Sequence, residues 1–324
     1  MNHTHAEHAP ISSRWTLADM PPQSGRTAVV TGTGGLGFEN ALALARAGAD
    51  VVIAGRNAVA GDAAVKDIQA RVPQAKVSFR CLDLASLDSI DDFAAELQGS
   101  LDALDLLINN AAVMTPPTRR TTSDGFELQF GTNYLGHFAL TARLMPLLVR
   151  SRGARVVTVS SVAARAARID FGDLQSQHNH RPMVAYGQSK LACLMFALTL
   201  QRQSEARGWG LTSVAAHPGI SRTQLLPNGA GPWSLPGLVR RFAWFLFQPA
   251  PQGALPTLYA ATAPYACGGA YYGPDSFGET RGLPALAKVP DAALDGATQQ
   301  RLWAESERLT RARFPAPGHL HAKA

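Results

Sequence analysis

The sequence has few cysteines, few aromatic residues and no long apolar run, and each shortage argues against a class of protein. Only three cysteines occur, Cys81, Cys193 and Cys267, and they are too widely spaced to form a CxxC pair. This argues against a disulfide framework and a zinc site and favours a reducing compartment, so we expect a cytoplasmic protein without a metal. No stretch reaches the roughly 18 apolar residues of a membrane span, so no stable membrane insertion is expected.

Basic residues outnumber acidic ones, giving a net charge of +6 at pH 7. These charges form no dense Lys/Arg run and are not interleaved with aromatic residues, so nucleic acid is not expected as a partner. The excess fits either a solvated basic surface or an anionic ligand such as a phosphorylated cofactor. Apolar residues make up 46% of the chain, which is enough to bury a substantial core.

From Arg26 onward, short β-branched runs alternate with longer helical stretches. Continuous apolar strands that alternate with helices are typical of a parallel sheet covered on both faces. We therefore predict an α/β fold of Rossmann type, a doubly wound parallel sheet of about seven strands with helices on both faces, in a single domain. The expected strands are 27–30, 51–54, 77–80, 106–108, 155–159, 211–215 and 268–273, and the expected helices are 39–47, 59–70, 87–97, 127–149, 185–207 and 292–311.

The domain is expected to span residues 25–315, after an N-terminal leader at 1–24 and before a tail at 316–324. Within it, residues 222–252 mix proline and glycine with tryptophan and phenylalanine. This composition predicts a lid of loop and helix over a substrate site, and it suits an apolar or aromatic alcohol or ketone. Packing of the same residues onto the core is the alternative.

A glycine-rich turn, Thr31-Gly-Thr-Gly-Gly-Leu-Gly37, follows the first expected strand and precedes a helix. In that context a GxGxxG pattern indicates a nucleotide site, because glycine lets the backbone approach a pyrophosphate and the helix N-terminus supplies amide donors. The expected cofactor contacts in this turn are Gly32, Gly34, Gly35, Leu36 and Gly37.

The second expected strand ends in Gly55 followed by Arg56. Sites for NAD usually place an acidic residue there to hold the ribose 2′-hydroxyl. Without that carboxylate a 2′-phosphate is not repelled, and a guanidinium can pair with it, so NADP(H) is favoured over NAD(H). Asp83 and Leu84, after the third strand, are placed to meet the adenine ring. The alternative for Asp83 is to cap the next helix.

Tyr186 and Lys190 lie four residues apart, which puts them on one face of the expected helix. Ser160 and Ser161 close a strand upstream, so a hydroxyl can face the same pocket. A free phenol ionises only at about pH 10, so a tyrosine acting as a base needs positive charge nearby. Lysine supplies such a charge.

Over residues 15–315 the sequence resembles the short-chain dehydrogenase/reductase family. The glycine-rich turn, the Asn109-Asn-Ala-Ala112 run, the Ser/Tyr/Lys set and Pro218-Gly219 occur in the family's order. The segment at 124–133 and the 25-residue gap from Ser161 to Tyr186 are similar to the branch of retinol dehydrogenases and protochlorophyllide reductase. Two departures stand out: the glycine turn is one residue shorter than usual, and Ala112 replaces a commoner glycine.

The resemblance implies a role for each residue. Tyr186 would give the proton that accompanies hydride transfer, and Lys190 would favour the phenolate and bind the nicotinamide ribose. Ser161 would hydrogen-bond the substrate oxygen, with Ser160 as the alternative, because either could close the strand. Asn133 would hold a water that resupplies the proton, unless it only satisfies backbone groups in its helix. The remaining expected cofactor contacts are Asn110 and Ala111 along the channel, and Pro218, Gly219 and Thr223 at the carboxamide.

We therefore expect an NADP(H)-dependent oxidoreductase that interconverts a lipophilic ketone or aldehyde and its alcohol. Reduction of an activated C=C or C=N bond, and a non-catalytic NADP(H)-sensing role, are the alternatives. Many members of the family pair through helices equivalent to 127–149 and 185–207, which predicts a homodimer or homotetramer. A monomer stays open, because the insert that contains His178, Asn179 and His180 could obstruct that surface.

Overall fold

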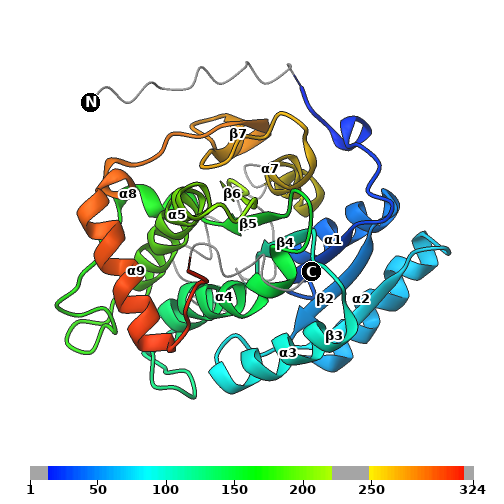
Figure 1. Ribbon diagram of the computed structural model, residues 1–324. Helices are drawn as coiled ribbons and strands as arrows, with labels where there is room; N and C mark the ends of the chain where they lie inside the picture. The colour runs from blue at the N-terminus through cyan, green and yellow to red at the C-terminus, as the bar shows by residue number, and fades with distance from the viewer. Residues whose placement is uncertain (1–13, 221–247, 317–324) are drawn as a thin grey trace.

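The computed structural model describes residues 14–220 and 248–316, and these contain one eight-stranded sheet (Figure 1). The strand order is β3-β2-β1-β4-β5-β6-β7-β8, and the first seven strands run parallel. The reversal of order between β1 and β4 confirms the doubly wound prediction. The strands are β1 (Thr27–Thr31), β2 (Asp50–Gly55), β3 (Val77–Cys81), β4 (Leu106–Asn109), β5 (Arg155–Val159), β6 (Thr212–Ala216), β7 (Tyr271–Ser276) and β8 (Arg281–Leu286).

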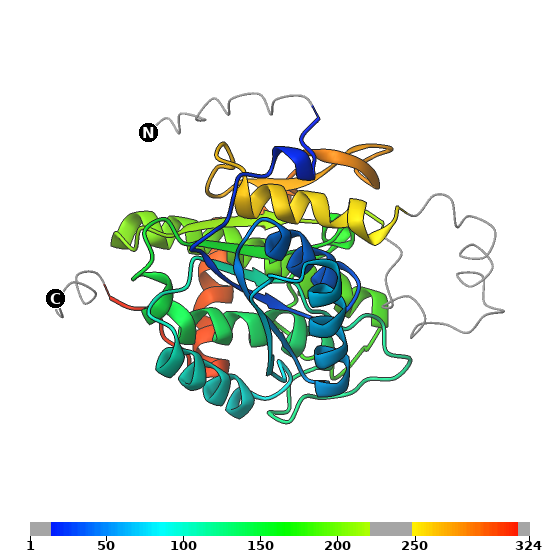
Figure 2. The same cartoon turned by 90° about the vertical axis from the view of Figure 1, so that its right-hand side faces the viewer.

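Helices cover both faces of this sheet (Figures 1 and 2). Ala28 and Val30 of β1 pack into one apolar cluster and Val29 packs into the other, which explains why the central strands are apolar at every position. One face carries α1 (Leu36–Arg46), α2 (Ala58–Arg71) and α7 (Ala250–Thr262), and the other carries α3 (Leu87–Ser100), α4 (Gly136–Leu148) and α5 (Pro182–Arg207), with α8 (Asp291–Leu294) and α9 (Gly296–Thr310) outside them.

The expected count of about seven strands is corrected by β8, which pairs antiparallel with β7. Gly282 and Pro284 make this segment look like a turn in the sequence, and such residues are tolerated in a strand at the edge of a sheet. The expected last strand at 268–273 is β7, which is shifted to Tyr271–Ser276. The tip between β7 and β8 carries Phe277, Gly278 and Glu279, all with positive φ.

The long helix expected at 127–149 starts differently. Residues Phe130–Leu135 form a π-helical turn (η2) before α4 begins at Gly136. Gly136 lets the start of α4 lie close to the segment after β3, because a Cβ there would lie 2.4 Å from the Leu84 carbonyl oxygen. Turns of this kind occur often at functional sites, and this one contains Asn133.

The part of the expected leader that the structure describes is folded against the domain. Trp15 is 5% exposed and packs edge-on against Tyr259 of α7, with ring centroids 5.5 Å apart. Of the expected lid, residues 222–247 lie outside the described residues, and Ala250 already begins α7. The tail from residue 317 onward also lies outside them.

Helix α5 is apolar and long enough to pass a length-and-composition test for a membrane span, although 89% of that window is buried inside the fold. It is therefore the core helix of the domain. Its outer side is covered by α9 and the segment after it: Trp303 and Phe314 pack on Phe138 and Phe196, and Ser306 is 2.6 Å from the Tyr134 hydroxyl. The helices through which we expected pairing are thus covered by other parts of the chain, and the insert before Tyr186 also contacts α5, where Gln188 donates to the Leu174 carbonyl.

Candidate active site

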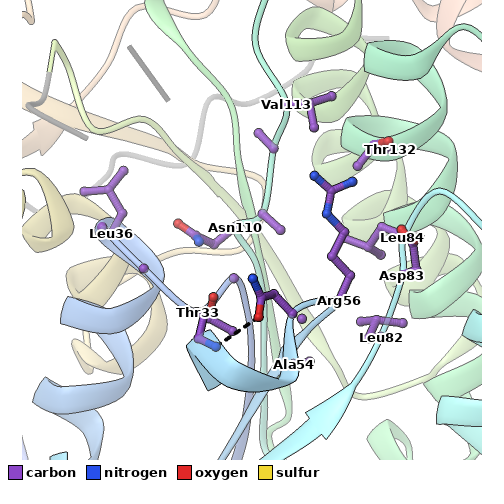
Figure 3. Close-up of a pocket in the computed structure, with 18 residues that line it drawn as sticks. Thr33, Leu36, Ala54, Arg56, Leu82, Asp83, Leu84, Asn110, Val113 and Thr132 are labelled. Carbon is purple, nitrogen blue, oxygen red and sulfur yellow. Dashed lines mark hydrogen bonds between the residues drawn. The ribbon is translucent and has the colours of Figure 1, made fainter. Parts of the chain in front are cut away.

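A cavity of about 490 Å³ lies at the carboxyl edge of the sheet, where the strand order reverses (Figure 3). This is where open α/β sheets bind their ligands. The expected cofactor residues that line it are Gly32, Gly34, Gly35, Leu36, Arg56, Asp83, Leu84, Asn110 and Ala111. The cavity is also lined by residues that the sequence motifs did not predict as contacts, among them Thr33, Asn57, Leu82, Val113 and Thr132. Most of these residues are next to a predicted contact in the sequence, so their position beside the motifs could have identified them.

The glycine-rich turn is shaped by contacts that only glycine permits. Gly32 has a φ of +103°, and a Cβ there would lie 2.9 Å from Asn110 Nδ2. A Cβ on Gly37 would lie 2.3 Å from the Gly32 carbonyl oxygen. Gly37 does not line the cavity, so its role is to let the turn pack on itself. The turn leads into α1, for which Gly35 is the N-cap, so a helix N-terminus, which favours anions such as a pyrophosphate, follows the glycines that line the cavity.

Arg56 supplies positive charge to the cavity. Its side chain points into the space on the side of Thr132 (Figure 3), and it has no ion pair among the described residues. No carboxylate follows β2 at this edge, since Gly55 occupies that position. Asp83 also lines the cavity, and its Oδ1 accepts the Ala85 amide at 2.9 Å. Asp83 does not cap α3, because Ser86 does. The alternative role for Asp83 is therefore wrong.

A buried histidine connects the π-helical turn that carries Asn133 to the end of β1 and the loop after β4. His137 Nδ1 lies 2.9 Å from the Asn133 carbonyl oxygen, which can only accept, so Nδ1 carries the proton. Nε2 then accepts from the Thr31 hydroxyl at 3.0 Å, and Thr31 Oγ1 in turn accepts the amides of Asn110 and Ala111 at 2.9 Å each. Burial lowers the pKa of His137 to about 4, so the imidazole is neutral in this network.

Tyr186 and Lys190 lie on one face of α5 and are 7% and 3% exposed. The Lys190 ammonium donates to the Val159 carbonyl at 2.9 Å and lies 6.0 Å from the centroid of the Tyr186 ring. Gly187 brings α5 close to η3 (Val162–Ala166), because a Cβ there would lie 3.1 Å from the Ala163 carbonyl oxygen. The helix that carries the tyrosine is therefore held against the segment that begins after Ser161. Neither Tyr186 nor Lys190 lines the cavity described above.

The two serines after β5 have different surroundings. Ser160 is 2% exposed, and its hydroxyl donates to the Lys190 carbonyl at 2.8 Å. Ser161 is less buried, and its Oγ accepts the Ala163 amide at 3.2 Å, which leaves its hydroxyl proton free to donate. The serine with a hydroxyl available to a substrate oxygen is therefore Ser161.

Asn133 is fully buried and joins the loop after β4 to α5. Its Oδ1 accepts the Val113 amide at 2.7 Å, and its Nδ2 donates to the Val113 carbonyl at 2.9 Å and to Ser189 Oγ at 3.0 Å. Its own carbonyl faces His137 Nδ1 and Cys193 Sγ. The partners of the side chain, Val113 and Ser189, lie outside the helix of Asn133, so the alternative that it only satisfies backbone groups in that helix is wrong. The water-holding role stays a prediction.

The loop after β6 carries the residues expected at the carboxamide. Gly219 has a φ of +62°, and a Cβ there would lie 2.2 Å from the Thr280 carbonyl oxygen. The Pro218 carbonyl accepts from Gln248 Nε2 at 2.5 Å. Neither residue lines the cavity, and Thr223 lies outside the described residues.

Comparison with known proteins decides the family. The profile of the short chain dehydrogenase family matches residues 26–230, which is more than half of the chain. The chain belongs to the short chain dehydrogenase family. It is 43% identical to mouse polyprenol dehydrogenase, over 90% of this chain and 85% of that protein. With human retinol dehydrogenase 13 the identity is 39%, over 90% and 86% of the two chains.

A solved structure agrees with this placement. The crystal structure of an uncharacterized protein from Mycobacterium paratuberculosis superposes on this short chain dehydrogenase with a TM-score of 0.77. The identity is 40%, over 94% of this chain and all of that one. The family, the Rossmann-type sheet and the likeness to the retinol-dehydrogenase branch, each expected from sequence motifs, are therefore confirmed.

Proposed function

We propose that this short chain dehydrogenase is an NADP(H)-dependent oxidoreductase that interconverts a lipophilic ketone or aldehyde and its alcohol. The observation that carries the proposal is the buried pair Tyr186 and Lys190, held against the turn that begins after Ser161, at the sheet edge that also carries the glycine-lined cavity. When bound, the nicotinamide cofactor would supply or accept the hydride. The chain's own groups would manage the proton and the charge on the substrate oxygen.

In the reducing direction, the Tyr186 hydroxyl would give its proton to the oxygen of the carbonyl as negative charge develops there. Ser161 would donate a hydrogen bond to the same oxygen. An ammonium has three donors, and Lys190 uses one on the Val159 carbonyl, which leaves two for the cofactor ribose and for the charge on the tyrosine. In the oxidising direction the same groups would act in reverse.

The preference for NADP(H) is supported by Arg56, which lines the cavity without an ion-pair partner among the described residues. A 2′-phosphate offers a guanidinium charge-assisted hydrogen bonds, and the missing carboxylate after β2 removes the usual hold on a free 2′-hydroxyl. The class of substrate is supported by the relatives, whose names refer to retinol and polyprenol, both lipophilic alcohols.

Oxidation of NADPH and NADH in the presence of a panel of apolar ketones, aldehydes and enones tests the reaction. We expect faster oxidation of NADPH, with an alcohol as the product. Saturation of the enone double bond with the carbonyl intact would instead favour the C=C reductase alternative. Binding of NADPH without turnover of any compound, together with a cellular role that survives Tyr186→Phe, would favour the sensing role.

Arg56→Asp tests the cofactor preference separately. Charge-assisted hydrogen bonds contribute about 1.5–3 kcal/mol, so kcat/KM for NADPH should fall by roughly 10- to 100-fold while that for NADH is kept or rises. Arg71→Gln is the matched control, because Arg71 lies on α2 outside the cavity and pairs with Asp67. A wild-type enzyme that prefers NADH, or a variant with unchanged preference, would refute the role of Arg56.

A further inference from the structure

A carboxylate at the tip of the β7–β8 hairpin contacts two segments of the site from outside the family motifs. Glu279 Oε2 lies 3.1 Å from His217 Nε2 and 2.5 Å from a guanidinium nitrogen of Arg165. Its other oxygen, Oε1, accepts the Lys288 amide at 3.0 Å. Although partial burial acts in the opposite direction, the hydrogen bonds from these three donors lower the pKa of Glu279 to about 2. The carboxylate is thus ionised, and both of its oxygens accept hydrogen bonds.

The first arm of this network runs to the loop after β6. The Gly219 amide donates to His217 Nδ1 at 3.2 Å, so Nδ1 is unprotonated and Nε2 carries the hydrogen that Glu279 accepts. The imidazole is 1% exposed, and Gly273 makes room for it, since a Cβ there would lie 2.0 Å from Nε2. His217 therefore fixes the orientation of the Gly219 amide, and Glu279 fixes His217.

The second arm runs to the segment after the candidate serine. Arg165 lies in η3, which begins directly after Ser161. Its guanidinium binds Glu279 and also donates to the Gly278 carbonyl at 2.9 Å. The hairpin tip is therefore bound through a charged pair to the turn that follows Ser161.

The hairpin tip adopts an unfavourable backbone to do this. Phe277 and Glu279 have φ values of +50° and +65°, in the left-handed region that side chains other than glycine rarely occupy. Such conformations persist where the surroundings enforce them, and they gather at functional sites. Next to Glu279, the Thr280 carbonyl accepts the Ile220 amide at 2.8 Å, which is a further tie to the loop after β6.

We propose that Glu279 is a positioning residue for hydride transfer, which sets the spacing between the Pro218–Gly219 loop and the Ser161 segment. This inference rests on the proposed function, in which the loop meets the nicotinamide carboxamide and Ser161 meets the substrate oxygen. Because hydride transfer depends on the distance between those two groups, loss of the carboxylate impairs the chemical step more than the binding of the adenosine half.

Glu279→Gln tests the proposal in the full chain. The amide keeps the size of the side chain but lacks the negative charge and one of the two acceptor oxygens. A misplacement of about 1 Å can cost on the order of 100-fold in rate, so we expect kcat to fall by about tenfold or more. The dissociation constant of NADPH should change by less than about threefold, because the cavity around Arg56 is intact. The fluorescence enhancement of bound NADPH, which reports on the nicotinamide ring, should also fall.

Arg165→Gln separates the two arms. It removes the tie to η3, and with it the link that sets the spacing, but leaves His217 bonded to Glu279. We therefore expect kcat to fall about as far as in Glu279→Gln, with wild-type fluorescence of bound NADPH, and wild-type kcat would count against the spacing role. Because Arg165 is 39% exposed, this variant should fold even if Glu279→Gln does not.

Glu305→Gln is the matched control. Glu305 has a similar exposure, 28% against 21%, and binds Arg308 at the same 2.5 Å, but it lies on α9. Equal kinetic effects of Glu279→Gln and Glu305→Gln, or lower thermal stability of Glu279→Gln with wild-type kcat and fluorescence, would overturn the positioning role. A wild-type enzyme that neither binds NADPH nor reduces a carbonyl would instead refute the proposed function itself.

Discussion

The neutral, buried state of His137 leads to a prediction about stability against pH. Its pKa is about 4 in the folded chain, because of burial, and 6.5 is the ordinary value. Below pH 6.5 His137 binds a proton in the unfolded chain but not in the folded chain. The free energy of unfolding therefore decreases as the pH falls from about 6.5 toward 4. Protonation would also put a hydrogen on Nε2, where the Thr31 hydroxyl now donates.

The magnitude follows from the two pKa values. One pKa unit corresponds to about 1.4 kcal/mol, and at pH 5 about one and a half units of the difference are expressed. The free energy of unfolding should therefore be about 2 kcal/mol lower at pH 5 than at pH 7.5 on account of this residue alone.

Urea unfolding at several pH values between 7.5 and 5, followed by circular dichroism, measures this loss. His137→Gln is the comparison, because an amide does not titrate in this range. The pKa of His217 is also lowered by burial, but His217 is present in both proteins and its contribution cancels in the difference. Parallel loss of stability in wild type and variant would refute the conclusion that the fold holds His137 neutral.

Three further predictions concern the chemistry and the assembly. Tyr186→Phe should lower kcat by about 10²- to 10⁴-fold with cofactor binding retained, since it removes the acid; wild-type turnover would exclude Tyr186 as the proton donor. Ser161→Ala should cost about 10²- to 10³-fold in kcat, whereas Ser160→Ala should mainly lower stability, by about 1 kcal/mol; the reverse order in steady-state assays would exchange their roles. Because α9 covers α4 and α5, light scattering after size exclusion should give the mass of one chain, and a stable dimer would require a different surface.

Sequence alone determined the features that depend on local spacing. The apolar, β-branched strands imply burial on two faces, and both clusters around β1 exist. The glycine pattern implies a turn that side chains would block, and Gly32 meets Asn110 as such a turn requires. Tyr186 and Lys190 share a helix face because a helix repeats every 3.6 residues, whatever surrounds it. The family could be read from these motifs in their order along the chain.

Tertiary structure decided what depends on contacts between distant parts of the chain. Strand β8 forms because it can pair with the free edge of β7, even though the glycine and proline of β8 argue against a strand. The state of His137 and the choice between Ser160 and Ser161 depend on partners about 30 to 106 residues away. No local motif marks Glu279, because its role depends on His217 and Arg165, which are 62 and 114 residues away in the sequence. Burial and hydrogen bonding across such separations are set by packing, which a local pattern does not record.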